Sequence, residues 1–170
     1  SIGAYNCILH HADDDIKDKF LPKIVEGKWS GTMCLTESQC GTDLGLIKTK
    51  AIKNTDGSFS LTGQKIFITS GDHDLTENIV HLVLAKIPGA PAGTKGISLF
   101  LVPKFNVNEN GSVGSRNGVS TLSIESKMGI KGSPTCVLNF DDAKGFLIGK
   151  ENKGLSSMFT MMNLERIIVG

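Results

Sequence analysis

Two short polar segments, about thirty residues apart, carry the side chains best suited to binding chemistry. The first, residues 33–43, follows an apolar run and contains Thr36, Gly41 and Thr42. Glycine lets the backbone approach a ligand closely and threonine supplies a hydroxyl donor, so such a turn offers N–H and O–H groups to an anion. Taken alone, the segment predicts an ordinary strand-to-turn connection, with an anion-binding turn as the alternative.

The second segment, residues 63–69, alternates like a strand and ends in Phe67, Ile68 and Thr69. Phe67 and Thr69 are two residues apart, so they point to the same face of a strand. This pair suits a flat ring that lies against Phe67 and accepts a hydrogen bond at its edge from Thr69. Taken alone, this segment too predicts an ordinary strand, with the ring-binding strand as the alternative.

A helix is predicted on each side of the strands that must position these segments. Residues 13–26 place apolar side chains on one face, begin with acidic residues and precede Gly27, which is suited to end a helix. Pro22 predicts a kink or a restart inside this helix. After Gly154, apolar residues again recur every three or four positions, and the pattern continues to the end of the chain.

The intervening chain predicts seven strands joined by short turns. Their ranges are 30–36, 47–53, 58–69, 78–86, 96–103, 119–126 and 135–141. Residues 54–57 predict a hairpin connection, residues 106–118 a surface excursion, and the two apolar faces of 78–86 a central strand. The pattern indicates a mainly β fold, a closed or two-sheet antiparallel barrel.

The composition argues against nucleic-acid binding, membrane spans and metal binding. The 170 residues are 39% hydrophobic and 21% charged, with a net charge of +1, as in one globular domain with its own core. This charge argues against a nucleic-acid partner, and no apolar run has the length of a membrane span or a signal peptide. The four cysteines lack Cys-x-x-Cys spacing and the four histidines are scattered, so no metal site is predicted.

Several isolated polar residues have structural interpretations. His81 lies in an apolar strand, which indicates a core histidine, and Cys34 and Cys136 lie in similar runs, where a thiol behaves as a small hydrophobe. His73 stands between two aspartates and predicts a loop residue or a substrate contact, with catalysis as the alternative. The acids at 141–142 follow a predicted strand, as solvated turn acids do.

Taken together, the two polar segments resemble the middle β-domain of the acyl-CoA dehydrogenases. The shared pattern is Leu-Thr-Glu at 35–37, Gly-Thr-Asp at 41–43, Gly-Gln-Lys at 63–65 and Phe-Ile-Thr at 67–69. The resemblance extends from Leu-Pro-Lys-Ile-Val at 21–25 to Lys-Met-Gly at 127–129 and Ile-Gly at 148–149. Within the family, residues 71–78 and 90–104 resemble most the branch that acts on 3-methylmercaptopropionyl-CoA, which implies a short acyl chain.

This resemblance implies an FAD-dependent α,β-dehydrogenation of an acyl-CoA thioester. In that reaction a carboxylate removes the α-proton, and the β-hydrogen leaves as a hydride to the flavin. The resemblance assigns FAD contacts to Met33, Leu35, Thr36, Gly41, Thr42, Phe67, Ile68 and Thr69. It assigns contacts with the CoA substrate to Thr42, Asn163 and Arg166, and a solvated helix face is the alternative for Asn163 and Arg166.

The resemblance also implies that the chain is the middle portion of a longer protein. Residues 1–28 are expected to end an N-terminal helical domain, residues 29–149 to form the β-barrel domain and residues 150–170 to begin a C-terminal helical domain. The family's catalytic base belongs to that last domain, so no catalytic residue is assigned before Gly170 and the fragment alone is expected to be inactive. The whole protein is expected to be a homodimer or homotetramer that reduces an electron-transfer flavoprotein or similar acceptor. We expect it in the bacterial cytoplasm, or in the mitochondrial matrix if the source is eukaryotic.

Three residues depart from the commoner family pattern. Met33 replaces an aromatic residue, Ser38 a proline and Phe67 a tryptophan. Phenylalanine keeps the aromatic face but lacks the indole N–H, so these departures concern the affinity for the ring more than its identity. Two alternative functions stay open: a flavin oxidase or monooxygenase on the same scaffold, and a non-catalytic β-barrel binding module. The donor-rich turn beside Phe67 favours an enzyme over a module.

Overall fold

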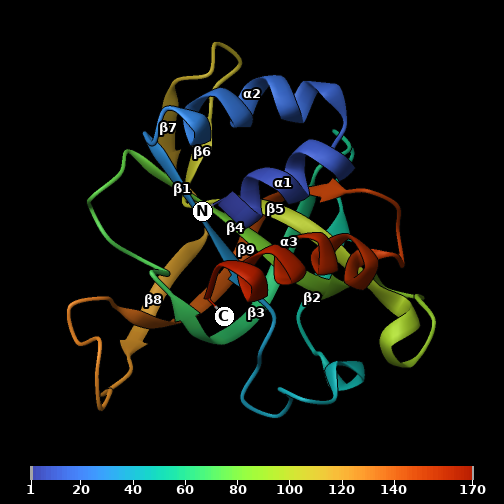
Figure 1. The fold of residues 1–170 in the computed structure, drawn as a ribbon. Coiled ribbons are helices and arrows are strands. Elements are labelled where there is room, and N and C mark those ends of the chain that lie inside the picture. The colour runs from blue at the N-terminus through green and yellow to red at the C-terminus, as the bar shows by residue number, and fades with distance from the viewer. Residues whose placement is uncertain (1, 170) are drawn as a thin grey trace.

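A computed structural model describes residues 2–169, and this part of the chain forms three α-helices, two short 3-10 helices (Leu44–Leu46 and Gly93–Gly96) and nine strands (Figure 1). The α-helices are α1 (Ile2–His11), α2 (Asp14–Val25) and α3 (Gly154–Val169). The strands are β1 (Trp29–Cys34), β2 (Lys50–Lys53), β3 (Phe59–Thr69), β4 (Asn78–Lys86), β5 (Ile97–Pro103), β6 (Phe105–Val107), β7 (Val113–Arg116), β8 (Val119–Ile124) and β9 (Thr135–Ile148). The prediction of a mainly β fold with flanking helices is confirmed.

One sheet holds seven of the described strands in the order β1-β4-β2-β3-β9-β5, with β8 beside β9 and a further pairing of β4 with β5. β1 runs parallel to β4, with Trp29 opposite Asn78, so the prediction of an antiparallel sheet is wrong for this pair. The cause is the loop after β3, which returns the chain to the start of β1, where Glu77 N donates to Lys28 O at 2.9 Å. Closure of the sheet into a barrel stays a prediction.

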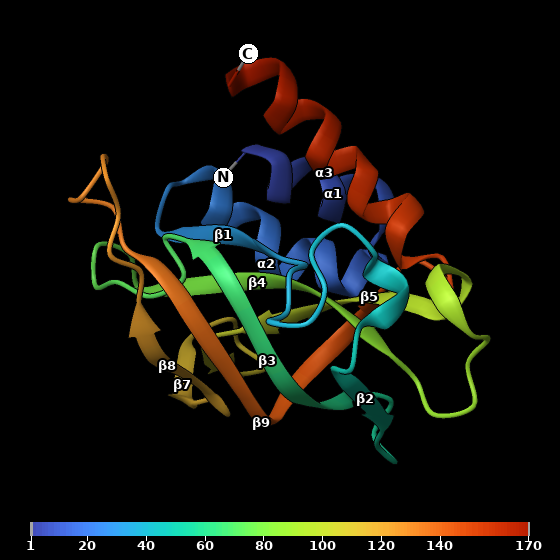
Figure 2. The same ribbon diagram turned by 90° about the horizontal axis from the view of Figure 1, so that it is seen from below.

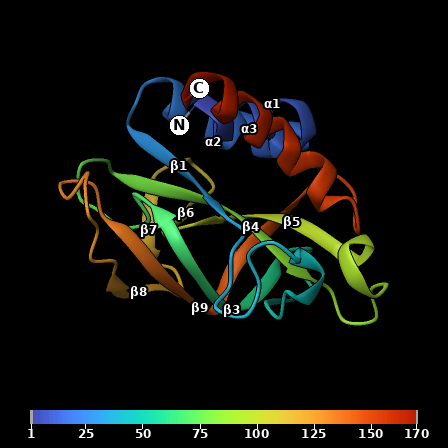
Figure 3. The ribbon, with the colours of Figure 1, turned by 60° about the horizontal axis from the view of Figure 1, so that its bottom comes forward.

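The two faces of β4 divide the apolar core into two clusters. Val80, Leu82 and Leu84 pack in the first cluster, which also contains buried side chains of all three helices. Val83 and Ala85 belong to the second cluster, which is formed by strands of the sheet. The helices lie together on one side of the sheet (Figure 3), so the first cluster fills the space between helices and sheet. The prediction that both faces of this strand are buried is confirmed.

α2 occupies the predicted range and is continuous through Pro22, so the helix does not restart there. α1 was not predicted, although Cys7 and Ile8 follow Ala4 by three and four residues, as on one face of a helix, and all three are buried. Among the residues that the structure describes, no helix is long and apolar enough to cross a membrane.

α1 and α3 come from opposite ends of the chain and pack against each other (Figure 2). The Cys7 thiol donates to Ser157 O at 3.3 Å, and His11 Nε2 lies 2.7 Å from Thr160 Oγ1. The terminal helices therefore cover part of each other's apolar surface instead of each exposing a full stripe.

Several predicted strand ends are shifted by one to three residues, and two ranges differ by more. The expected excursion at 106–118 contains the β6–β7 hairpin, whose Asn- and Gly-rich turn hides the short strands. β9 continues to Ile148, so Asp141 and Asp142 lie within a strand instead of after it, although both are exposed as predicted. Asp142 has a φ of 49°, a local irregularity of the strand, and the two adjacent acids resemble a turn in the sequence.

Candidate functional site

The two polar segments meet where the chain leaves β1 and the second half of β3 passes beside it. Ile66 N donates to Thr36 O at 2.9 Å, and Lys65 Nζ donates to Leu35 O at 3.0 Å. Gly41 also lies near Thr36, because a Cβ on Gly41 would be 3.5 Å from Thr36 Cγ2. The fold thus joins the segments that the sequence analysis singled out.

A bulge in β3 sets the direction of Phe67. The register against β9 shifts between Lys65 and Ile68, so β3 has one extra residue there. Phe67 has a φ of 61° and is 59% exposed, Ile68 is buried and Thr69 is exposed. A positive φ at a bulky residue costs on the order of 1–3 kcal/mol, and such strain is concentrated at functional sites. The ring and the Thr69 side chain therefore share the exposed side of this segment.

The turn after β1 holds free hydrogen-bond donors. In the described part of the chain, no group accepts from the hydroxyls of Thr36, Thr42 and Thr69 or from the N–H groups of Gly41 and Thr42. Gly41 and Thr42 are exposed. Neutral donors around a half-exposed aromatic ring fit a flat ligand that carries both hydrogen-bond acceptors and an anionic group.

Three of the predicted contact residues are apolar side chains that pack in or against the two core clusters. Met33 and Leu35 pack against the first core cluster, and Ile68 is 2% exposed in the second. Their side chains therefore support the two segments from behind, while Leu35 O and Ile68 O already accept hydrogen bonds from Lys65 Nζ and Gly71 N.

A buried ion pair lies directly behind the junction. Lys65 Nζ is 2.9 Å from Glu37 Oε1, and the side chains are 0% and 4% exposed. Thr49 donates to the same oxygen from its N–H at 3.1 Å and from its hydroxyl at 2.5 Å. Glu37 Oε2 accepts from Lys48 N at 2.8 Å and from Gln39 Nε2 at 2.6 Å. The carboxylate thus accepts three hydrogen bonds at Oε1 and two at Oε2.

This environment keeps Glu37 ionised. Burial opposes ionisation, but the Lys65 ammonium and the hydrogen bonds from Thr49 and the Lys48 N–H lower the pKa of Glu37 to about 2. Burial lowers the pKa of Lys65, an effect that the charge of Glu37 opposes. Sequence reasoning did not single out this pair, although a lysine in the apolar alternation of a strand is the signal that could have found it.

A second polar cluster fixes the loop that follows Thr69. Asp72 accepts from Lys104 Nζ at 2.6 Å and from the Thr121 hydroxyl at 2.9 Å, and Arg116 Nη2 lies 3.5 Å away. Burial opposes ionisation of Asp72, but the hydrogen bonds from Lys104 and Thr121 hold its pKa below the usual value. The loop that leaves β3 is therefore anchored to Lys104, which stands between β5 and β6, and to β7 and β8.

Two of the predicted substrate contacts lie on α3. Asn163 and Arg166 are exposed and three residues apart, so they share a helix face. Within residues 2–169, neither makes a hydrogen bond or ion pair with another side chain. The structure leaves both available to a ligand or to another segment, and does not join them to the turn at 41–42.

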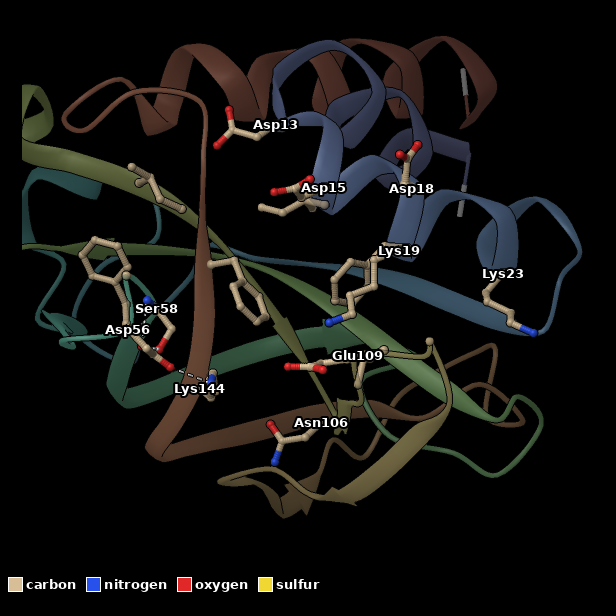
Figure 4. Close-up of a pocket in the computed structure, with 18 of the residues that line it drawn as sticks. Asp13, Asp15, Asp18, Lys19, Lys23, Asp56, Ser58, Asn106, Glu109 and Lys144 are labelled. Carbon is tan, nitrogen blue, oxygen red and sulfur yellow. Dashed lines mark hydrogen bonds and ion pairs between the residues drawn. The ribbon is translucent and has the colours of Figure 1, made fainter.

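A large hollow of about 1470 Å³ lies elsewhere, between α2, the β2–β3 turn, the β6–β7 hairpin and β9 (Figure 4). Its rim mixes acidic and basic side chains, including Asp15, Lys19 and the exposed pair Asp56–Lys144 at 2.9 Å. None of the residues predicted to contact FAD or CoA lines it. The hollow is therefore separate from the junction of the two polar segments.

The comparison with known families places both polar segments in one match. The family described as "Acyl-CoA dehydrogenase, middle domain" matches residues 32–143. Over 168 residues the chain is 48% identical to the 3-methylmercaptopropionyl-CoA dehydrogenase of Ruegeria pomeroyi, and over 177 residues it is 49% identical to a butyryl-CoA dehydrogenase of Syntrophomonas wolfei. Each alignment covers 99% of this chain and 29% of the relative, so the chain spans well under half the length of these proteins.

Solved structures agree with this match. An acyl-CoA dehydrogenase of Bacillus anthracis, solved in complex with FAD, superimposes with a TM-score of 0.74 and 33% identity over 94% of this chain and 25% of that one. The family match covers well over half of the chain and includes the β1–β3 junction. On this evidence the chain belongs to the acyl-CoA dehydrogenase family.

Proposed function

We propose that this chain is the flavin-contacting middle portion of an FAD-dependent acyl-CoA dehydrogenase, which forms a double bond between the α- and β-carbons of an acyl-CoA thioester. The observation that carries the proposal is the junction itself. Ile66 N–H donates to Thr36 O, and this bond aligns a strained, exposed Phe67 with a turn of free donors. The relative from Bacillus anthracis, whose structure contains FAD, supports the choice of cofactor.

Each part of the junction has a role in this proposal. Thr36 and Thr69 donate hydrogen bonds to the polar edge of the flavin ring, and Phe67 covers one face of it. Gly41 and Thr42 present N–H and hydroxyl groups to the pyrophosphate. A flavin held there would supply the acceptor for the hydride that leaves the β-carbon of the substrate. Donors at the ring edge stabilise the negative charge that reduction places there.

The substrate is proposed from two relatives and from α3. The similar identities to the 3-methylmercaptopropionyl-CoA and butyryl-CoA dehydrogenases support a short acyl chain. Thr42, Asn163 and Arg166 are assigned to the CoA portion, since a guanidinium pairs well with phosphate oxygens. The catalytic carboxylate and the electron-accepting partner are assigned outside this chain, with an electron-transfer flavoprotein as the partner class.

The organisation of the whole protein is part of the same proposal. Residues 1–28 and 150–170 are assigned to helical domains that flank a β-barrel domain at 29–149, in a protein that assembles as a homo-oligomer. The coverage of 29% of each curated relative supports a longer protein.

The test is flavin binding by the full-length protein. We expect a visible flavin absorbance band after purification, and a dissociation constant for FAD that rises about thirtyfold in the double variant Thr36→Val, Thr69→Val, since each of the two lost hydrogen bonds contributes about 1 kcal/mol. Thr62→Val, an exposed threonine of the same strand, is the matched control. A purified protein without the flavin band would contradict the proposal and favour a binding module.

A further inference from the structure

The Glu37–Lys65 pair lies between the two segments that the proposed function assigns to the flavin. Glu37 follows Thr36 directly, and Lys65 directly precedes the bulge that carries Phe67. A lysine with 0% side-chain exposure is unusual, because removing an ammonium from water is costly unless partners replace the solvent. Its two acceptors, Leu35 O and Glu37 Oε1, both belong to the first segment.

Glu37 also fixes the turn that precedes Gly41. Its backbone exchanges two hydrogen bonds with Cys40, Glu37 N to Cys40 O at 2.9 Å and Cys40 N to Glu37 O at 3.0 Å. Its carboxylate accepts from Gln39 within this turn and from Thr49 beyond it. The position of the free donors at 41–42 therefore depends on where this carboxylate is held.

Lys65 performs the corresponding task for β3. The hydrogen bond from Ile66 N to Thr36 O joins β3 to the segment after β1 at one residue. It leaves the distance between the two segments at neighbouring residues undetermined. Two further bonds from Lys65 Nζ, at 3.0 and 2.9 Å, fix that separation. A hydrophobic pair of similar size would fill the space without imposing either distance, because dispersion contacts have little directionality.

We propose that Glu37 and Lys65 are positioning residues for the cofactor: their buried ion pair sets the distance and orientation between the donor turn at 36–42 and the aromatic segment at 67–69. This inference rests on the proposed function, since it takes those two segments to be the two sides of the flavin site. The pair touches neither substrate nor ring and acts through the backbone that it holds.

The experiment uses the full-length protein stripped of flavin and reloaded. For Lys65→Met, we expect the dissociation constant of FAD to rise at least tenfold and the bound flavin spectrum to lose the fine structure of a rigidly held ring. Lys144→Met removes an equally short but exposed ion pair with Asp56 and is the matched control, with an expected change of less than twofold.

A double variant separates positioning from stability. In Glu37→Gln, Lys65→Met no charge is left buried alone, so the melting temperature of the apoprotein should recover towards that of the unaltered protein. We expect the FAD affinity to stay at least fivefold weakened, because the two fixed distances are still missing. Recovery of affinity together with stability would overturn the inference.

Two further outcomes complete the test. If Lys65→Met does not fold, Thr49→Val, which removes one hydroxyl donor from Glu37, decides the question: weaker FAD binding supports the inference and unchanged binding overturns it. If the unaltered protein binds FAD and the variant with Thr36→Val and Thr69→Val binds it weakly, the proposed function stands. Normal binding by Lys65→Met would then overturn only the positioning role.

Discussion

The polar side chains at the β1–β3 junction fall into two groups, those with complete hydrogen bonding and those without a partner in the described residues. Both carboxylate oxygens of Glu37 accept hydrogen bonds, whereas the hydroxyls of Thr36, Thr42 and Thr69 have no hydrogen-bond partner among the described residues. A satisfied buried group holds geometry, because moving it breaks several bonds at once. A free donor at the surface is available to a ligand. The division of roles in the proposed site follows from this difference.

Acid should reveal the contribution of Glu37 to stability. Its pKa is about 2 in the folded protein and about 4.3 in an unfolded chain, so the unfolded state binds more protons between these values. The stabilisation, on the order of 3 kcal/mol, is present above pH 4.3 and is lost as the pH falls towards 2. We expect Glu37→Gln to melt lower at pH 6 and to change less between pH 6 and pH 3 than the unaltered protein.

The control for this experiment is Asp56→Asn. That carboxylate is exposed and its pair with Lys144 is screened by solvent, so the variant should keep most of the acid sensitivity. An acid response in Glu37→Gln as steep as in the unaltered protein would show that other carboxylates govern it.

The cysteines should be unreactive in the folded protein. Cys7, Cys34, Cys40 and Cys136 are free and buried, and burial raises the pKa of Cys7 and of Cys34 to about 12. Thiolates are the reactive form, so iodoacetamide at pH 8 should leave these residues unmodified until the protein is denatured. Peptide mass mapping before and after denaturation gives the answer, and rapid native labelling of Cys34 would contradict the packing around β1.

At the scale of elements, β3 depends on close contact with the chain that enters β2. Gly63 has a φ of 152°, and a Cβ there would lie 2.6 Å from Thr49 Oγ1 and 2.8 Å from Thr49 Cα. Backbone so close cannot move aside cheaply, and Thr49 is also a donor to Glu37. Gly63 and the ion pair are therefore coupled through Thr49, which touches both.

Gly63→Ala tests this coupling. We expect a loss of about 1–3 kcal/mol in stability, measured as a lower melting temperature, together with weaker FAD binding, because the displaced Thr49 disturbs Glu37. Gly129→Ala is the control, since a Cβ at Gly129 would meet nothing within 4 Å. Equal melting temperatures for the two variants would show that β2 and β3 separate without cost.

At the scale of the whole molecule, the helical layer and the sheet share one core. The first cluster takes side chains from α1, α2 and α3 as well as from β4 and β5. α3 begins against β5, where a Cβ on Gly154 would lie 2.3 Å from Ser98 C and 2.5 Å from Leu99 N. The orientation of α3, which carries Asn163 and Arg166, therefore depends on this contact.

Gly154→Ala should loosen the helical layer. We expect a loss of about 1–3 kcal/mol in stability and faster hydrogen exchange in α3 and α1, because α3 must shift away from backbone that cannot yield. Ser156→Ala, an exposed position of the same helix, is the control. Unchanged exchange rates in both helices would contradict the view that β5 positions the layer.

The sequence determined the elements whose signals are local. The two apolar faces of 78–86 predicted β4, the turn residues at 54–57 predicted the β2–β3 hairpin, and apolar spacing predicted α2 and α3. Each of these depends on residues within a few positions of one another, and burial on both faces leaves a pattern that can be read directly. The residue patterns of the two polar segments are also local, so they could be recognised in the sequence, and the resemblance to the family was based on them.

Tertiary structure alone decided which distant segments meet. The parallel pairing of β1 with β4, the burial of Lys65 against Glu37 and the packing of α1 on α3 join residues from 28 to about 150 positions apart. The alternation of apolar and polar residues along a strand indicates which side chains are buried. It does not indicate which residues they pack against, because many partners satisfy the same apolar pattern. Which partner a strand meets depends on the cost of closing the loops between them and on the packing of the whole core. Neither can be derived from a short stretch of sequence.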